Sequence, residues 1–192
     1  MLLKLFLALP IIFSTPELTV NWLTSNQRSV ALVLQGEDPI IGKCLQSSLT
    51  LRYKYQLQIC KRRPLWFDVC KDELELRRSV TFDPISRTYD LNSKWAYKAE
   101  EEIVQHFSSR MELLKSLQTI KAVDLNVLAE NSLSFIQSQR SYISARVSSD
   151  CKGDYNETLA ELSHFLSFGL IRISGFDTGW LDFRMRERSQ SK

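Results

Sequence analysis

The chain has 192 residues, of which 44% are hydrophobic and 24% are charged. This composition is typical of a globular protein with a sizeable core, and it excludes a disordered chain and a wholly membrane-embedded one. The formal net charge of +3, from 25 basic and 22 acidic residues, is too small to indicate a polyanionic partner, so no nucleic acid is expected.

Residues 1–15 have the pattern of a signal peptide or an N-terminal anchor. Lys4 precedes the apolar run Leu5–Phe13, and the small residues Ser14 and Thr15 follow it. Such a run has the length of a signal-peptide core and reaches only about half the way across a bilayer. No Ala-x-Ala cleavage site is present, so an uncleaved leader that tethers the protein to the inner membrane stays an alternative. A buried element of a cytosolic protein is the third reading. We expect a periplasmic or otherwise exported protein.

Residues 16–186 are expected to form a single β-rich domain, and residues 187–192 a polar tail. A segment of about 170 residues can bury one core and gives little reason to expect two. No internal repeat or low-complexity block divides it.

The first part of this domain contains two short strands and a short helix. Alternating or β-branched residues predict strands at Leu18–Leu23 and Val30–Leu34, joined by a polar turn. A short helix is predicted over Asp38–Ser48, with Asp38 as its N-cap and Pro39 at its first position.

The clearest pattern in the chain is a strict alternation over Leu49–Cys60. Successive side chains of a strand point to opposite faces, so a period of two buries one row only in an extended conformation. We expect the apolar row to lie in the core. It consists of Leu49, Leu51, Tyr53, Tyr55, Leu57 and Ile59.

A second alternating strand follows the loop that carries Trp66. Its apolar row is Leu74, Leu76, Val80 and Phe82. The sequence Asp83–Ser86 has Asp and Pro at the positions that a tight turn favours. Residues Arg87–Leu91 should then return antiparallel, which gives a meander of at least three strands.

One long amphipathic helix is predicted from Trp95 to about Leu117. Apolar residues recur there at spacings of four and three, and Ser93 is a candidate N-cap. The repeating residues are Trp95, Ala99, Ile103, Phe107, Met111, Leu114 and Leu117. This helix is expected to cover one face of the sheet.

The last third of the chain returns to strand character. Tyr142–Val147 alternates, and an apolar group at Phe165–Met185 predicts further strands. Between them, a surface loop is expected at Asp150–Asn156 and a turn or two of helix at Glu157–His164.

The four cysteines, Cys44, Cys60, Cys70 and Cys151, are an even number in a chain that looks exported, so disulfides are plausible. Their pairing stays open among three possibilities. A Cys60–Cys70 bond would join two adjacent strands. It would need a β-bulge or an irregular loop end, because the two residues have opposite parity relative to their apolar rows.

No catalytic, metal or cofactor residue is predicted. His164, Ser163, Ser167, Asp177 and Asp182 contain the groups of an acid–base or nucleophile set, but sequence proximity does not place them within hydrogen-bond reach. The sequence has no Cys-x-x-Cys, nucleophile elbow, phosphate loop or His-Glu-x-x-His motif.

Two kinds of surface are candidates for interaction. Asp177 and Gly179 predict a tight corner that presents Trp180, either as a plain hairpin or as a recognition corner together with Trp66. Basic clusters that can attract anionic headgroups are the second kind, with a solvated face as the primary interpretation because acidic residues lie nearby. They contain Lys61, Arg62, Arg63, Arg184, Arg186 and Arg188.

Four segments resemble a known family. They are Leu51–Leu57, Trp66–Asp68, Phe82–Tyr89 and Gly179–Phe183. Together they are similar to a bacterial family of exported proteins catalogued as domain of unknown function 4390. The resemblance implies a Gram-negative envelope protein of unassigned activity and provides no catalytic residue. Members of that family usually lack four cysteines, so the resemblance gives no support to disulfides.

The sequence therefore predicts an α+β, β-rich fold. We expect an antiparallel sheet or sandwich with one long amphipathic helix and one or two short helices packed on it. The leading functional hypothesis is a non-catalytic interaction or scaffold module whose partner is an envelope protein or the membrane surface. The alternative is a carrier of an apolar ligand such as a lipid, and a hydrolase comes third.

Overall fold

The computed structural model describes residues 16–23, 29–36, 38–47, 49–96, 101–125, 127, 140–152 and 174–184. The predictions for the leader (1–15), the polar tail (187–192) and the helical turn at 157–164 lie outside these residues. So do the candidates Ser163, His164, Ser167, Arg186 and Arg188. Within the described ranges, no helix has both the length and the hydropathy needed to cross a membrane.

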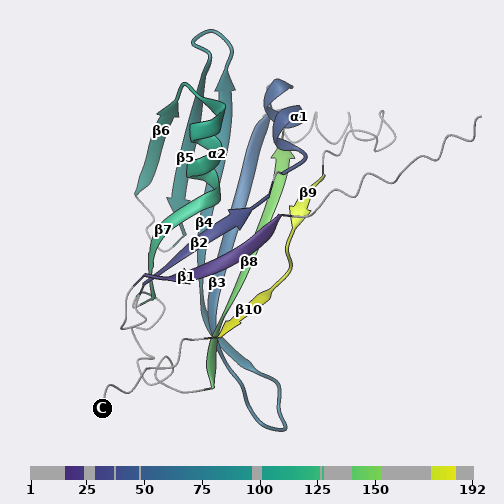
Figure 1. Cartoon of the computed structure of the whole chain (residues 1–192), viewed down its shortest axis with the longest axis vertical. Coiled ribbons are helices and arrows are strands. Elements are labelled where there is room, and N and C mark those ends of the chain that lie inside the picture. The colour runs from purple at the N-terminus through teal and green to yellow at the C-terminus, as the bar shows by residue number, and fades with distance from the viewer. Residues whose placement is uncertain are drawn as a thin grey trace, which may run out of the picture.

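The described residues form two sheets, of which the larger has seven strands, each antiparallel to its neighbours. The order is β10-β8-β3-β4-β5-β6, and β9 also pairs with β8. The strands are β3 (Thr50–Lys61), β4 (Val69–Asp83), β5 (Thr88–Trp95), β6 (Glu102–Phe107), β8 (Ser141–Lys152), β9 (Ser174–Asp177) and β10 (Leu181–Arg184). The long strands β3, β4 and β8 form the centre of this sheet (Figure 1).

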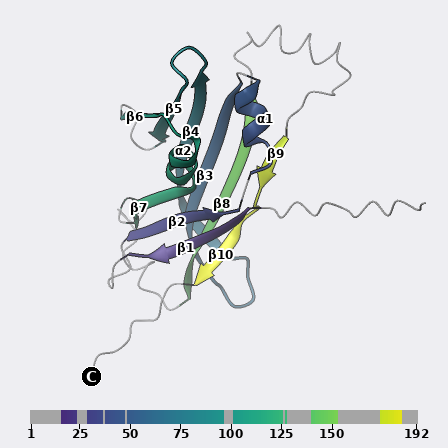
Figure 2. The same ribbon diagram turned by 45° about the horizontal axis from the view of Figure 1, so that its top comes forward.

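A second sheet of three strands crosses one face of the larger one (Figures 1 and 2). Its order is β1-β2-β7, again antiparallel throughout. The strands are β1 (Glu17–Trp22), β2 (Ser29–Gln35) and β7 (Thr119–Asp124). Two helices complete the described fold, α1 (Ile41–Gln46) and α2 (Arg110–Gln118). The antiparallel, β-rich architecture expected from the sequence is confirmed.

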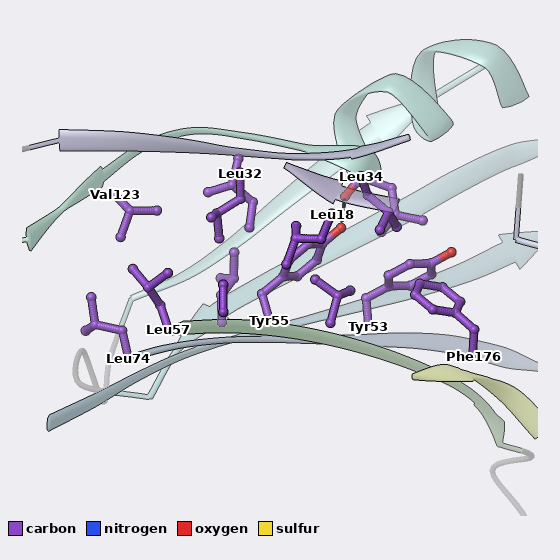
Figure 3. Close-up of a cluster of buried hydrophobic side chains, with 14 of the residues drawn as sticks. Leu18, Leu32, Leu34, Tyr53, Tyr55, Leu57, Leu74, Val123 and Phe176 are labelled. Carbon is purple, nitrogen blue, oxygen red and sulfur yellow. Dashed lines mark hydrogen bonds between the residues drawn. The ribbon is translucent and has the colours of Figure 1, made fainter. Parts of the chain in front are cut away.

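The core lies between the two sheets. Leu51, Tyr53, Tyr55, Leu57 and Ile59 of β3 are each at most 2% exposed, as their alternation predicts. Figure 3 shows the tyrosines and Leu57 facing Leu18, Leu32, Leu34 and Val123 of the smaller sheet. The second strand predicted from alternation, β4, contributes Leu74, Leu76 and Val80 to the same cluster. Burying these side chains supplies the main favourable free energy of folding.

The predicted long helix over Trp95–Leu117 is wrong. Trp95 ends β5, and β6 then pairs with β5 from Glu102 to Phe107, so the region meant to begin the helix forms a strand ladder. Within the described part of this segment, only α2 is helical, and its buried residues are Leu113 and Leu117. Side chains of β6 are largely exposed, so this edge strand carries no alternating signal that would reveal it.

The structure changes two predicted helix caps and confirms one predicted turn. Ser93 lies within β5 and is not an N-cap. The tight turn after β4 is confirmed: Asp83 accepts hydrogen bonds from the Ser86 hydroxyl at 2.7 Å and the Ile85 amide at 2.8 Å. These two bonds lower the pKa of Asp83. Helix α1 is shorter than predicted, with Ile40 rather than Asp38 at its N-cap position.

Candidate interaction surface

The hairpin between β3 and β4 ends in a loop at the end of the larger sheet opposite the β4–β5 turn (Figure 1). A disulfide joins Cys60 of β3 to Cys70 of β4 just before this loop, and the two residues are direct register partners. The bulge that this pairing requires is present, because the register shifts between Gln58 and Ile59. The loop 61–69 therefore starts from a covalently fixed base.

The loop exposes three consecutive large apolar side chains. Leu65 is 100% exposed, Trp66 78% and Phe67 95%. Elsewhere in the described part of the chain, exposed large apolar residues occur singly or, at Ile103 and Val104, as a pair. Leu65 has a φ of 69°, in the left-handed region, which is energetically unfavourable for a branched side chain. We name residues 65–67 the hairpin tip.

Asp68 holds the base of the hairpin tip on both sides. Its carboxylate accepts a hydrogen bond from the Tyr142 hydroxyl of β8 at 2.7 Å and one from the Arg63 amide at 3.3 Å. Burial, followed by the hydrogen bond to Asp68, raises the pKa of Tyr142 to about 12. Tyr142 thus stays protonated and donates to Asp68 at all physiological pH values.

Basic residues gather at the base of the loop that carries the hairpin tip. Arg62 and Arg63 are exposed, and the Arg62 guanidinium lies 5.3 Å from the centre of the Tyr142 ring. Tyr142 of β8 pairs with Arg184 of β10 on one side and with Cys60 of β3 on the other. Arg184 therefore lies at the same end of the sheet as Lys61. The structure therefore unites four of the basic residues proposed from sequence. We call Lys61, Arg62, Arg63 and Arg184 the basic collar.

Sequence reasoning missed Arg140, which joins this end of the sheet. Its carbonyl accepts the backbone N–H of Arg62 at 3.0 Å, and its side chain is exposed. The sequence indicates only weakly that Arg140 belongs to the basic group, because it stands alone in a polar stretch. Only the pairing of β3 with β8 places it next to the Lys61–Arg63 run.

The pairing of β9 and β10 with β8 places Asp177 and Trp180 along an edge of the sheet, whereas Trp66 lies in the loop beyond the Cys60–Cys70 pair. β9 and β10 both pair antiparallel with β8, so the segment between them interrupts one edge strand and does not form a hairpin. Gly179 adopts a φ of 66° and donates its amide to Asp177 at 2.9 Å. Trp180 is 39% exposed.

Asp177 and Asp182, the described members of the suggested catalytic set, have structural partners. Asp177 accepts the Nε–H of Arg146 at 2.9 Å, and this bond lowers the pKa of Asp177. Asp182 accepts the hydroxyl of Ser144 at 3.0 Å.

A hollow of about 760 Å³ lies over the polar face of the larger sheet. Asp177, Arg52 and Asp150 line it, and the last two form an ion pair. No group of three His, Cys, Asp or Glu residues within the described ranges could hold a metal ion.

A buried polar cluster lies at the other end of the sheet, beside a second disulfide between Cys44 of α1 and Cys151 of β8. Asp38 is 2% exposed and accepts hydrogen bonds from the Tyr53 hydroxyl at 2.5 Å and the Ser149 hydroxyl at 2.8 Å. Its other oxygen accepts the Ile40 amide at 3.0 Å. Burial, and then Asp38, raise the pKa of Tyr53. This cluster ties the start of α1 to β3 and β8.

The charge of Asp38 should stabilise this junction. We expect Asp38→Asn to lower the free energy of unfolding by about 1–2 kcal/mol, because charge-assisted bonds from two hydroxyls become neutral ones. Urea denaturation measures the change. Asp150→Asn is the matched control, since its carboxylate is exposed and its loss should cost less than about 1 kcal/mol. Equal effects of the two changes would contradict the structural role of Asp38.

These features define a two-sheet, disulfide-linked β protein that exposes an apolar hairpin tip on a loop whose base carries the basic collar. The model of the family described as Domain of unknown function (DUF4390) matches residues 34–152, so the chain belongs to that family. This confirms the resemblance inferred from the strand and turn motifs. No curated protein matches the chain, and no solved structure does.

Proposed function

We propose that this protein is a non-catalytic interaction module of the bacterial cell envelope, and that it engages its partner through the hairpin tip. The observation that carries the proposal is the near-complete exposure of Leu65, Trp66 and Phe67 on a base fixed by a disulfide and by Asp68. Soluble proteins rarely leave a contiguous apolar group in water unless it binds something.

The envelope location has two supports. The leader pattern at residues 1–15 is typical of export, and the signal it provides is independent of the fold. All four cysteines pair in disulfides, which form and persist in oxidising compartments such as the periplasm.

The carrier and hydrolase alternatives have weaker support. Side chains from both sheets meet between the layers (Figure 3), so a carrier would have to open this contact to admit a lipid. A hydrolase needs a base near a nucleophile. Of the described candidates, Asp177 instead bonds to the Arg146 guanidinium. Asp182 accepts the hydroxyl of Ser144, but Ser144 is only 3% exposed, so a substrate could not reach it.

Site-specific photo-cross-linking in living cells tests the proposal. A benzoylphenylalanine placed at Phe67 should form a specific adduct, which mass spectrometry identifies as protein or lipid. The same probe at Ile85 is the matched control, because Ile85 is 94% exposed at the tip of the β4–β5 turn. The proposal fails when the two positions give the same adducts, or when neither gives any.

A further inference from the structure

We propose that the hairpin tip docks onto an anionic lipid bilayer, with Leu65, Trp66 and Phe67 entering the headgroup region. This inference names the partner of the surface proposed above and therefore rests on that function. Three properties of the described residues favour lipid over protein as the partner of the hairpin tip. They are its shape, its charge and its rigidity.

The shape of the hairpin tip suits a flat, deformable surface. The tip is a narrow projection at one end of the sheet (Figure 1). A stable protein–protein interface buries about 1,200–2,000 Å² in total, and the core of such an interface needs more than three side chains. A bilayer requires no complementary pocket, and tryptophan in particular favours the boundary between headgroups and hydrocarbon.

The basic collar complements an anionic surface. Three basic residues and one acidic residue, Asp68, lie between Cys60 and Cys70. The Asp68 carboxylate already accepts bonds from Tyr142 and from the Arg63 amide. Arg184 adds a further charge from β10, and the exposed Asp182, two residues before it on the same strand face, offsets part of that charge. Cationic side chains that flank an apolar tip can stay at the headgroups while the tip enters deeper.

The hairpin tip is held in place before it meets a membrane. The Cys60–Cys70 bond closes its base, and the Asp68–Tyr142 hydrogen bond fixes the loop against β8. A group that is already ordered loses less conformational freedom on binding. The small apolar surface of the tip and the basic collar can then together give a measurable affinity for a bilayer.

Vesicle co-sedimentation of the full chain tests the inference. Vesicles contain phosphatidylethanolamine and phosphatidylglycerol at 3:1, and neutral phosphatidylcholine vesicles are the reference. We expect Leu65→Ser/Trp66→Ser/Phe67→Ser to weaken partitioning onto the anionic vesicles at least tenfold. Arg62→Gln/Arg63→Gln should weaken it about fivefold for each charge removed, and only on the anionic vesicles.

Two control variants match these changes. Ile85→Ser removes an exposed apolar side chain at the opposite turn, and Arg77→Gln removes an exposed charge from the sheet face. Both should partition as the unchanged protein does. Since every variant carries residues 1–15, any binding by that segment is the same throughout. Near-ultraviolet circular dichroism checks that each variant is folded.

The outcomes separate the two proposals. If the tip variants partition like the controls, docking onto lipid is overturned. A protein adduct at Phe67 in cells, found together with that result, would leave the interaction function standing with a protein as the partner. If partitioning is unaffected and the Phe67 probe yields no specific adduct, both proposals fail.

Discussion

Replacing Cys44 and Cys151 together with alanine should lower the free energy of unfolding by about 5 kcal/mol. The bond joins residues 107 positions apart, and in the chain-entropy model a cross-link stabilises by restricting the unfolded chain over the loop it closes. A loss of this size is comparable to the whole stability of a small domain. Thermal and urea denaturation of the oxidised protein and the double variant measure it.

The matched comparison is Cys60→Ala/Cys70→Ala. These residues are 10 positions apart, so the same model predicts a loss of about 3 kcal/mol. The difference between the two double variants depends on loop length. If the two double variants lost the same free energy of unfolding, this pairing would be contradicted, because under either alternative pairing each double variant removes one cysteine from both bonds. Peptide mapping without reduction identifies the bonded pairs directly.

The sheet could be predicted where one face is buried and the other is not. The alternation of Leu51–Ile59 identifies β3 because its even and odd rows lie in different environments. An edge strand such as β6 has both rows largely exposed, so its sequence carries no such contrast. The spacing of Ile103, Phe107 and Met111 then imitates a helix. Pairing with β5, a tertiary effect, decides the conformation.

The hairpin tip could be located from sequence but not characterised. Lys61–Arg63 and Trp66 stand out in the chain, yet no local pattern shows that Leu65 and Phe67 are even more exposed than Trp66. The contribution of Arg184 depends on β10 pairing with β8 and on β8 pairing with β3. Such long-range register is invisible to a local pattern.

Arg78 is a half-buried charge whose position the period-two pattern indicates. It stands between Leu76 and Val80, in the row that faces the core, whereas Arg77 is on the opposite face. Its Nη1 donates to the carbonyl oxygens of Ser116 at 2.7 Å and Leu117 at 3.1 Å, at the C-terminus of α2. Tyr55 donates to the same Leu117 oxygen at 2.6 Å. Burial lowers the pKa of Arg78, and the guanidinium remains charged.

We expect Arg78→Met to lower the free energy of unfolding by about 3 kcal/mol. Methionine fills a similar volume but leaves buried carbonyls of α2 short of a donor and removes a cation from the negative end of the helix dipole. It also removes the cation–π contact with Tyr55, whose ring centre is 5.9 Å from the guanidinium carbon. Urea denaturation measures the loss, and hydrogen exchange should show α2 opening first.

Arg77→Met is the control for the core-facing position of Arg78, because the two arginines are adjacent in sequence and Arg77 is exposed. The Arg77 side chain is 73% exposed, and its partner Glu75 also pairs with Lys54, so Glu75 keeps a cation when Arg77 is replaced. Such pairs contribute at most about 1 kcal/mol. Since adjacent residues of a strand face opposite sides, a large effect at Arg78 with a small one at Arg77 requires β4 to present Arg78 to α2. The reverse order would mean that the register of β4 is shifted by one residue and that its apolar row does not face the core.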